Sequence, residues 1–169
     1  TRWATTHGIA DRATVPNGFV AGGSWNYVVS PNAVLVATNS SWRSVKGTQE
    51  ASTPVTAWRD TAFDDANWAT VSTPVFFGDP YDVLANPGTL LPDMQGQYSS
   101  VYLRTSFTVT RAAYVTNLLL RAQSDDGFIA WINGVEVYRY NVALGQPAYD
   151  STAVSEASES VSGVSTIQY

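Results

Sequence analysis

The sequence contains no cysteine, a single histidine (His7) and a single lysine (Lys46). The absence of cysteine excludes disulfide bonds and thiolate metal sites, so packing and hydrogen bonds must hold the fold. One histidine cannot form a zinc site or a proton relay by itself, and no serine or threonine has an evident base beside it. The sequence therefore predicts a protein that is not an enzyme.

Positive charge and long apolar runs are also scarce. Nine Lys and Arg residues stand against 14 Asp and Glu residues, which gives a formal charge of −5. No basic stripe is available to neutralise a phosphate backbone, and no stretch approaches the roughly 20 apolar residues that span a bilayer. We expect neither a nucleic-acid partner nor a membrane span. Abundant Ser, Thr, Ala, Val, Gly and Asn with almost no Lys is typical of secreted or cell-surface proteins.

What the sequence does contain is β-forming segments. The chain has 169 residues, of which 44% are hydrophobic, enough for the core of one β-sandwich. Residues 100–109 alternate apolar and polar side chains, which predicts a half-buried strand. The continuous apolar run at 115–122 predicts a central strand covered on both faces. Residues 128–132 and 135–138 flank Asn133-Gly134, the strongest short-range hairpin signal. The fold class is therefore expected to be all-β.

Two segments look irregular, residues 78–96 and the acidic stretch at 151–163, and residues 1–32 differ again from the rest of the chain. Residues 78–96 contain several Pro and Gly residues and are expected to form a long surface loop, a common place for binding residues. Candidate ligand-binding residues of this loop are the aromatic Tyr81 and its polar neighbours Asp79, Asp82 and Asn86. One aromatic residue of the segment 1–32, Trp25, is a further candidate. The alternative is that the loop aromatic packs onto its own scaffold. Residues 1–32 are expected to be an N-terminal arm or the end of a preceding unit, and residues 33–169 the sandwich.

Several motifs occur in an order that resembles a family of galactose-binding-like jelly-roll modules of large secreted bacterial proteins. They are Trp58-Arg59, Phe63-Asp64-Asp65-Ala66-Asn67-Trp68, Phe77-Gly78-Asp79, Val101-Tyr102-Leu103-Arg104-Thr105-Ser106-Phe107, and Ser124-Asp125-Asp126-Gly127 leading to Ile132-Asn133-Gly134-Val135-Glu136-Val137. The resemblance implies a jelly-roll β-sandwich of two antiparallel sheets. It also implies a carbohydrate-binding or adhesive role, and in some members a structural calcium.

The Asp-Asp-Gly hairpin is also similar to that of the PA14 lectin-type module, whose paired aspartates hold calcium. Asp125 and Asp126 are therefore the candidate metal ligands, and a turn stabilised by local amides is the alternative. Asp64 and Asp65 are paired carboxylates of the kind glycosidases use, but their adjacency in a turn motif favours capping or turn formation. The resemblance places Trp58 and Trp68 in the core.

Relatives of that family continue into a further strand that this sequence does not reach. We therefore hold a second interpretation, a structural subunit of a surface assembly in which chains exchange strands. The arm at 1–32 is the candidate donor strand, and copies of the same chain are the candidate partners. The first interpretation, a module that binds a glycan or polysaccharide, is favoured by the resemblance.

Overall fold

The computed structural model describes residues 33–78, 88–110, 112, 115 and 118–156, and the backbone of 165–167. The chain divides into two units, Thr1–Val34 and Leu35–Tyr169. The fold described below is that of the second unit. The arm expected at residues 1–32 lies outside the described residues.

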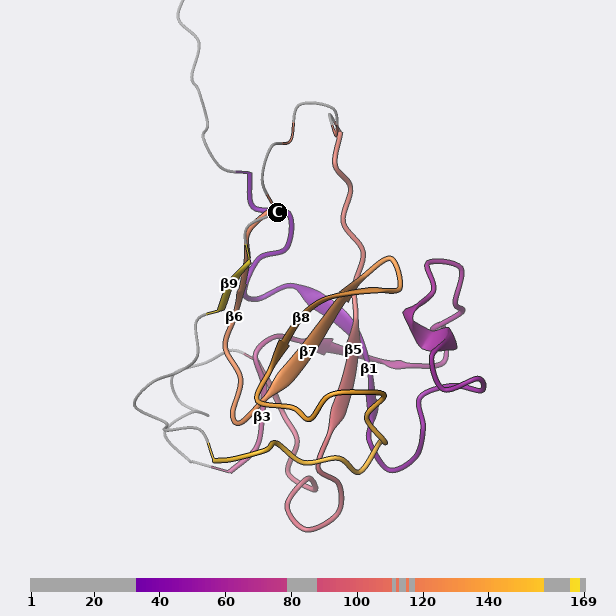
Figure 1. Ribbon diagram of the computed structural model, residues 1–169, viewed down its shortest axis with the longest axis vertical. Helices are drawn as coiled ribbons and strands as arrows, with labels where there is room; N and C mark the ends of the chain where they lie inside the picture. Colours follow the sequence, from indigo (N-terminus) through magenta and orange to yellow (C-terminus); the bar gives the residue numbers. More distant parts are fainter. Residues whose placement is uncertain are drawn as a thin grey trace, which may run out of the picture. The chain divides into compact units, whose positions relative to one another are not determined.

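Strands are the main regular structure of the described part of the chain (Figure 1), and η1 (Ala57–Arg59) is a single turn of 3-10 helix. The all-β class that the sequence predicts is thereby confirmed. Within the described ranges there is no helix with the length and apolar character needed to cross a bilayer. The elements in chain order are β1 (Ser41–Lys46), η1 (Ala57–Arg59), β2 (Ala69–Ser72), β3 (Val75–Phe76), β4 (Thr89–Leu90), β5 (Val101–Arg104), β6 (Leu120–Ala122), β7 (Phe128–Ile132), β8 (Val135–Tyr140) and β9 (Ser165–Ile167).

The largest sheet has the strand order β2-β1-β5, and both pairings are antiparallel. Strand β1 is central, and its Arg43 pairs with Thr70 on β2 and with Arg104 on β5. The pairs β6-β9 and β7-β8 are also antiparallel, whereas β3-β4 is parallel. Several antiparallel sheets in one unit are consistent with a β-sandwich. The jelly-roll order of connections stays a prediction.

The hairpin expected around Asn133-Gly134 is confirmed. Strands β7 and β8 pair antiparallel up to Ile132 and Val135, which flank the two turn residues. Both turn residues have positive φ, 51° at Asn133 and 82° at Gly134, as a type I′ turn requires. Local turn chemistry thus sets the register next to the turn, and an irregularity between Ala130 and Trp131 shifts it farther along the pair.

An aromatic cluster joins η1 to strands β5 and β7. Trp58 is 7% exposed, and its ring meets Tyr102 and Trp131 edge-on at centroid distances of 5.2 and 5.3 Å. Trp68 lies 6.4 Å from Trp58 and is half-buried. Rings in such edge-to-face pairs add to the stability that their buried area already gives. The interior position expected for Trp58 is confirmed, and the cluster connects a strand of one sheet with a strand of another.

The strand expected at 115–122 is shorter than its apolar run. Strand β6 covers only Leu120–Ala122, and the side chains of Val115 and Leu119 are 48% and 46% exposed. The expectation of cover on both faces is therefore wrong at these residues. A run of leucines indicates apolar character, but it does not supply the neighbouring strands that would cover it. The strand expected at 100–109 likewise ends at Arg104.

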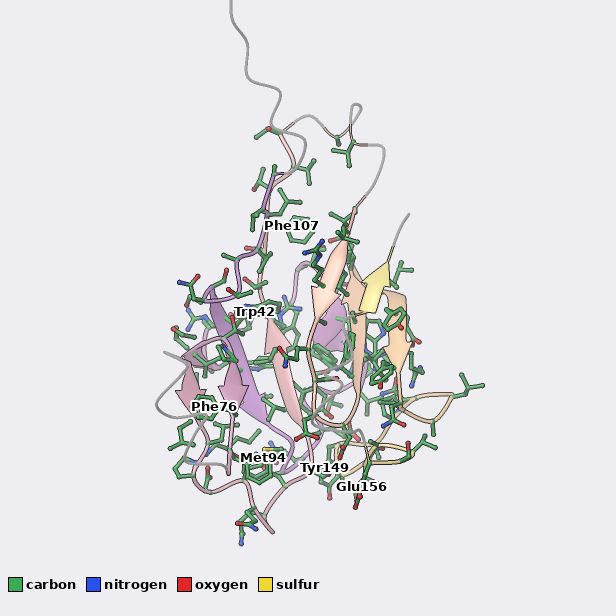
Figure 2. All side chains as sticks on the ribbon, turned by 90° about the vertical axis from the view of Figure 1, so that its left-hand side faces the viewer. Trp42, Phe76, Met94, Phe107, Tyr149 and Glu156 are labelled. Atoms are coloured by element: carbon green, nitrogen blue, oxygen red, sulfur yellow. The ribbon has the colours of Figure 1, made fainter. Side chains whose placement is uncertain are left out.

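The segment 78–96 is not a loop throughout. Thr89 and Leu90 form β4, and the next residue, Leu91, is 7% exposed. The Leu91 amide donates to the carbonyl of Phe76 (2.7 Å), which extends the contact with β3. The sequence did not predict this short strand, because the prolines on either side of it are typical of loops. In Figure 2, Phe76 and Met94 lie in the lower part of the unit, and Phe107 lies near its upper end.

Candidate functional site

A hollow of about 340 Å³ opens over the sheet formed by β1, β2 and β5. Three of its lining residues are charged and four carry hydroxyl groups. The lining residues are Ser41, Trp42, Arg43, Asp65, Thr70, Arg104, Thr105 and Ser106. This is the candidate functional site, and below it is called the β1–β5 hollow.

The register of the sheet places two arginines side by side in this hollow. Arg43 and Arg104 are direct partners on β1 and β5, and Thr70 continues the same row on β2. Paired residues on neighbouring strands present their side chains on the same face. Like charges opposite each other are destabilising, so the pair needs an anion between its members.

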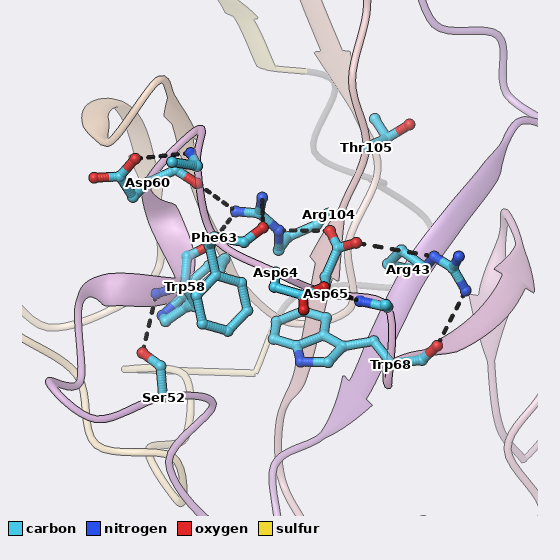
Figure 3. Close-up of polar contacts among 12 residues, drawn as sticks. Arg43, Ser52, Trp58, Asp60, Phe63, Asp64, Asp65, Trp68, Arg104 and Thr105 are labelled. Carbon is cyan, nitrogen blue, oxygen red and sulfur yellow. Dashed lines mark hydrogen bonds and ion pairs between the residues drawn. The ribbon is translucent and has the colours of Figure 1, made fainter.

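Asp65 supplies that anion (Figure 3). Its Oδ2 accepts a hydrogen bond from Arg104 Nε at 2.8 Å, and its Oδ1 lies 3.9 Å from Arg43 Nε. The side chains of Arg104, Asp65 and Arg43 are 17%, 27% and 42% exposed. The short contact with the less exposed arginine is the strong one, and the contact with Arg43 is looser.

Arg104 also fixes the segment that carries Asp65. Its Nη1 donates to the carbonyls of Trp58 and Asp60, and its Nη2 approaches the carbonyl of Phe63 at 3.5 Å. The guanidinium carbon lies 5.2 Å from the centroid of the Phe63 ring, a cation–π contact. Arg104 is therefore a structural residue that ties residues 58–65 to β5 and holds Asp65 in place.

Arg43 is less fully engaged. Its Nη1 donates to Thr70 Oγ1 (2.9 Å) and to the Trp68 carbonyl (3.3 Å), whereas its Nη2 makes no hydrogen bond to any residue that the structure describes. Its neighbour on β1, Trp42, also lines the hollow.

The two adjacent aspartates have different roles. Asp64 Oδ1 accepts the amide N–H of Ala66 at 3.0 Å, a local turn bond, so the expected turn role is confirmed for Asp64. Asp65 also takes part in a turn, because its carbonyl accepts the amide N–H of Trp68 at 2.9 Å, but its carboxylate pairs with arginines 22 and 39 residues away in the sequence. Ion pairs at this separation cannot be read from a local motif.

A second polar cluster lies against the aromatic core. The guanidinium of Arg59 stacks over the ring of Trp131 at 4.1 Å, and its Nη2 donates to Gln146 Oε1 (2.8 Å). Burial lowers the pKa of Arg59, and burial together with the charge of Glu50 raises the pKa of Tyr102 to about 12. These groups are engaged in packing, and we assign them no binding role.

The ligand-binding residues expected from the sequence are Asp79, Tyr81, Asp82, Asn86 and Trp25, and all of them lie outside the described residues. None of the residues lining the hollow was among them. The signal for the hollow was an arginine in each of two strand segments, Ser41–Lys46 and Val101–Arg104, where β-branched and aromatic residues are the enriched types.

The Asp-Asp-Gly segment leads into β7. The side-chain amide of Asn141 donates to the Asp126 carbonyl (3.1 Å), and a Cβ on Gly127 would lie 2.9 Å from the Tyr140 carbonyl oxygen. Calcium takes six to eight oxygen ligands. Among the described residues, no third acidic or histidine side chain joins Asp125 and Asp126 to complete such a group. Calcium at this segment stays a prediction.

No protein-family model, curated protein or solved structure matches this chain. The resemblance to galactose-binding-like modules is therefore neither supported nor opposed by a relative.

Proposed function

We propose that this chain is a non-catalytic, extracellular carbohydrate-binding module, and that the β1–β5 hollow holds a sugar residue of a glycan. The chemistry of the hollow carries this proposal. Its volume of about 340 Å³ lies in the range of small-molecule sites, and hydroxyl, guanidinium and carboxylate groups surround it. Sugars present hydroxyls that both donate and accept, and these side chains supply partners for both.

The contacts within the hollow support binding rather than catalysis. A general base must be able to take a proton from its substrate, and a serine nucleophile needs such a base beside it. The one carboxylate in the hollow, that of Asp65, faces two guanidinium groups. The hydroxyls of Ser41, Thr105 and Ser106 therefore have no activating partner among the described residues that line the hollow. An adhesive role on a cell surface would use the same binding.

Removing one hydroxyl from the hollow is expected to weaken glycan binding. Oligosaccharides that bind would first be found on a glycan array, and their affinity would be measured by titration calorimetry with the wild-type chain and with Ser106→Ala. Loss of one hydrogen bond to the sugar is expected to raise Kd about three- to tenfold. The side chain of Ser106 is exposed, so the fold is expected to tolerate the change.

Ser99→Ala is the matched control, because Ser99 is also an exposed serine near β5 but does not line the hollow. Its Kd is expected to equal that of the wild type. Equal affinities for all three proteins would show that the ligand binds elsewhere. If no oligosaccharide on the array bound the wild-type chain, the proposed function would be wrong.

A further inference from the structure

The charges in the β1–β5 hollow do not balance. Arg43, Asp65 and Arg104 are its charged lining residues, two cations and one anion. Asp65 lies 2.8 Å from Arg104 Nε but 3.9 Å from Arg43 Nε, so its carboxylate compensates Arg104 first. The hollow keeps one uncompensated positive charge, and that charge lies on Arg43.

Arg43 is also the charged residue of the hollow that is best placed to reach a ligand. Its side chain is 42% exposed, against 17% for Arg104, and its Nη2 makes no hydrogen bond within the described part of the chain. The planar guanidinium matches the two oxygens of a carboxylate, and charge-assisted hydrogen bonds of this kind are about twice as strong as neutral ones.

The groups around Arg43 indicate a second property of the ligand, which is that it carries hydroxyl groups. Nη1 of Arg43 is held by Thr70 Oγ1 and the Trp68 carbonyl, which fixes the plane of the guanidinium. The hydroxyls of Ser41 and Ser106 line the same hollow and suit the hydroxyls of a sugar ring. The hollow thus combines one fixed cation with several hydroxyl partners.

We infer that the sugar residue bound in the β1–β5 hollow carries a carboxylate, as a uronic acid does, and that Arg43 Nη2 is the donor that recognises it. This inference rests on the proposed function. The formal charge of the chain is −5, so long-range electrostatics disfavour polyanions in general. A preference for an acidic sugar must therefore come from the local contact with Arg43.

The test compares three oligosaccharides of one length and linkage by titration calorimetry. They are a uronide, its methyl ester, which keeps the shape and removes the charge, and the matching neutral hexose oligosaccharide. The uronide is expected to bind wild-type chain at least tenfold more tightly than either neutral ligand. Arg43→Gln is expected to remove this preference. Arg43→Lys is expected to retain only part of it, because an ammonium group lacks the planar fork.

Each outcome separates the inference from the proposed function. Equal binding of the uronide and its ester would overturn the acidic-sugar inference and leave a neutral-sugar module standing. Binding of none of the three, and of no other glycan on the array, would overturn the proposed function itself. A preference that survives in Arg43→Gln would refute the role of Arg43. The ester comparison needs no variant, so it decides the inference even if Arg43→Gln folds poorly.

Discussion

Replacing Arg104 with glutamine is expected to lower the free energy of unfolding by about 3 kcal/mol. Breaking a largely buried ion pair by removing one member typically costs about 3–5 kcal/mol, and Arg104 is 17% exposed. Arg43, 3.9 Å from Asp65, would compensate only part of the charge left on that carboxylate, so the expected loss lies at the low end of this range. The carbonyls of Trp58 and Asp60 would lose their donor at the same time. For a domain of this size, the loss corresponds to a fall in Tm of about 6–12 °C. Thermal and urea unfolding followed by circular dichroism would measure it.

Lys46→Gln is the control for this variant. Lys46 pairs with Asp93 at 2.6 Å, but both side chains are about half exposed, and solvent-exposed pairs contribute little to stability. Its Tm is expected to stay near that of the wild type. If Arg104→Gln lowered Tm no more than Lys46→Gln, Arg104 would contribute no more than an exposed surface charge, and the structural role assigned to it would be wrong.

Trp58→Ala is expected to destabilise the domain by about 3–5 kcal/mol, the range found for large aromatic residues removed from a core. Trp58 is 7% exposed and contacts Trp68, Tyr102 and Trp131, so its loss would leave a cavity between η1, β5 and β7. Near-UV circular dichroism and urea unfolding would report the loss of packing. Since domains are stable by only about 5–15 kcal/mol, this variant is expected to be close to its unfolding limit.

Two further variants separate packing from other effects. Trp58→Phe is expected to cost less, because it keeps an aromatic ring and the indole Nε1 has no hydrogen-bond partner within the described residues to be lost. Phe77→Ala removes an aromatic ring that is 42% exposed and is expected to change stability little. If Phe77→Ala destabilised the chain as much as Trp58→Ala, the cluster around Trp58 would not be the core.

Local signals in the sequence predicted part of the fold correctly. The Asn133-Gly134 hairpin was predictable because the turn requires positive φ at adjacent residues, a demand that few residue types meet. The extent of other elements depended on distant partners. Strand β4 exists because residues 89–90 pair with β3, and Leu119 is exposed because no described neighbour covers it. Neither the pairing of residues 89–90 nor the exposure of Leu119 can be predicted from the residues of the segment itself.

The candidate site was less predictable than the fold. The arginine pair of the hollow is made by the register of β1 against β5, which joins residues 61 positions apart in the sequence. The anion between them, Asp65, comes from a turn motif whose neighbour Asp64 has only a local role. The sequence instead indicated a proline-rich loop as the binding site, because loops often carry binding residues. Register and long-range ion pairs become visible only in three dimensions.

The central claim is that the β1–β5 hollow binds a sugar, and an NMR titration tests it most directly. The isotope-labelled chain would be titrated with the tightest-binding oligosaccharide from the array while the backbone amide signals are followed. The account expects saturable shifts concentrated at residues 41–43, 65 and 104–106, with the hairpin turn at 133–134 unchanged. Saturable shifts located elsewhere on the chain, with the amides of 41–43 and 104–106 unmoved, would contradict it.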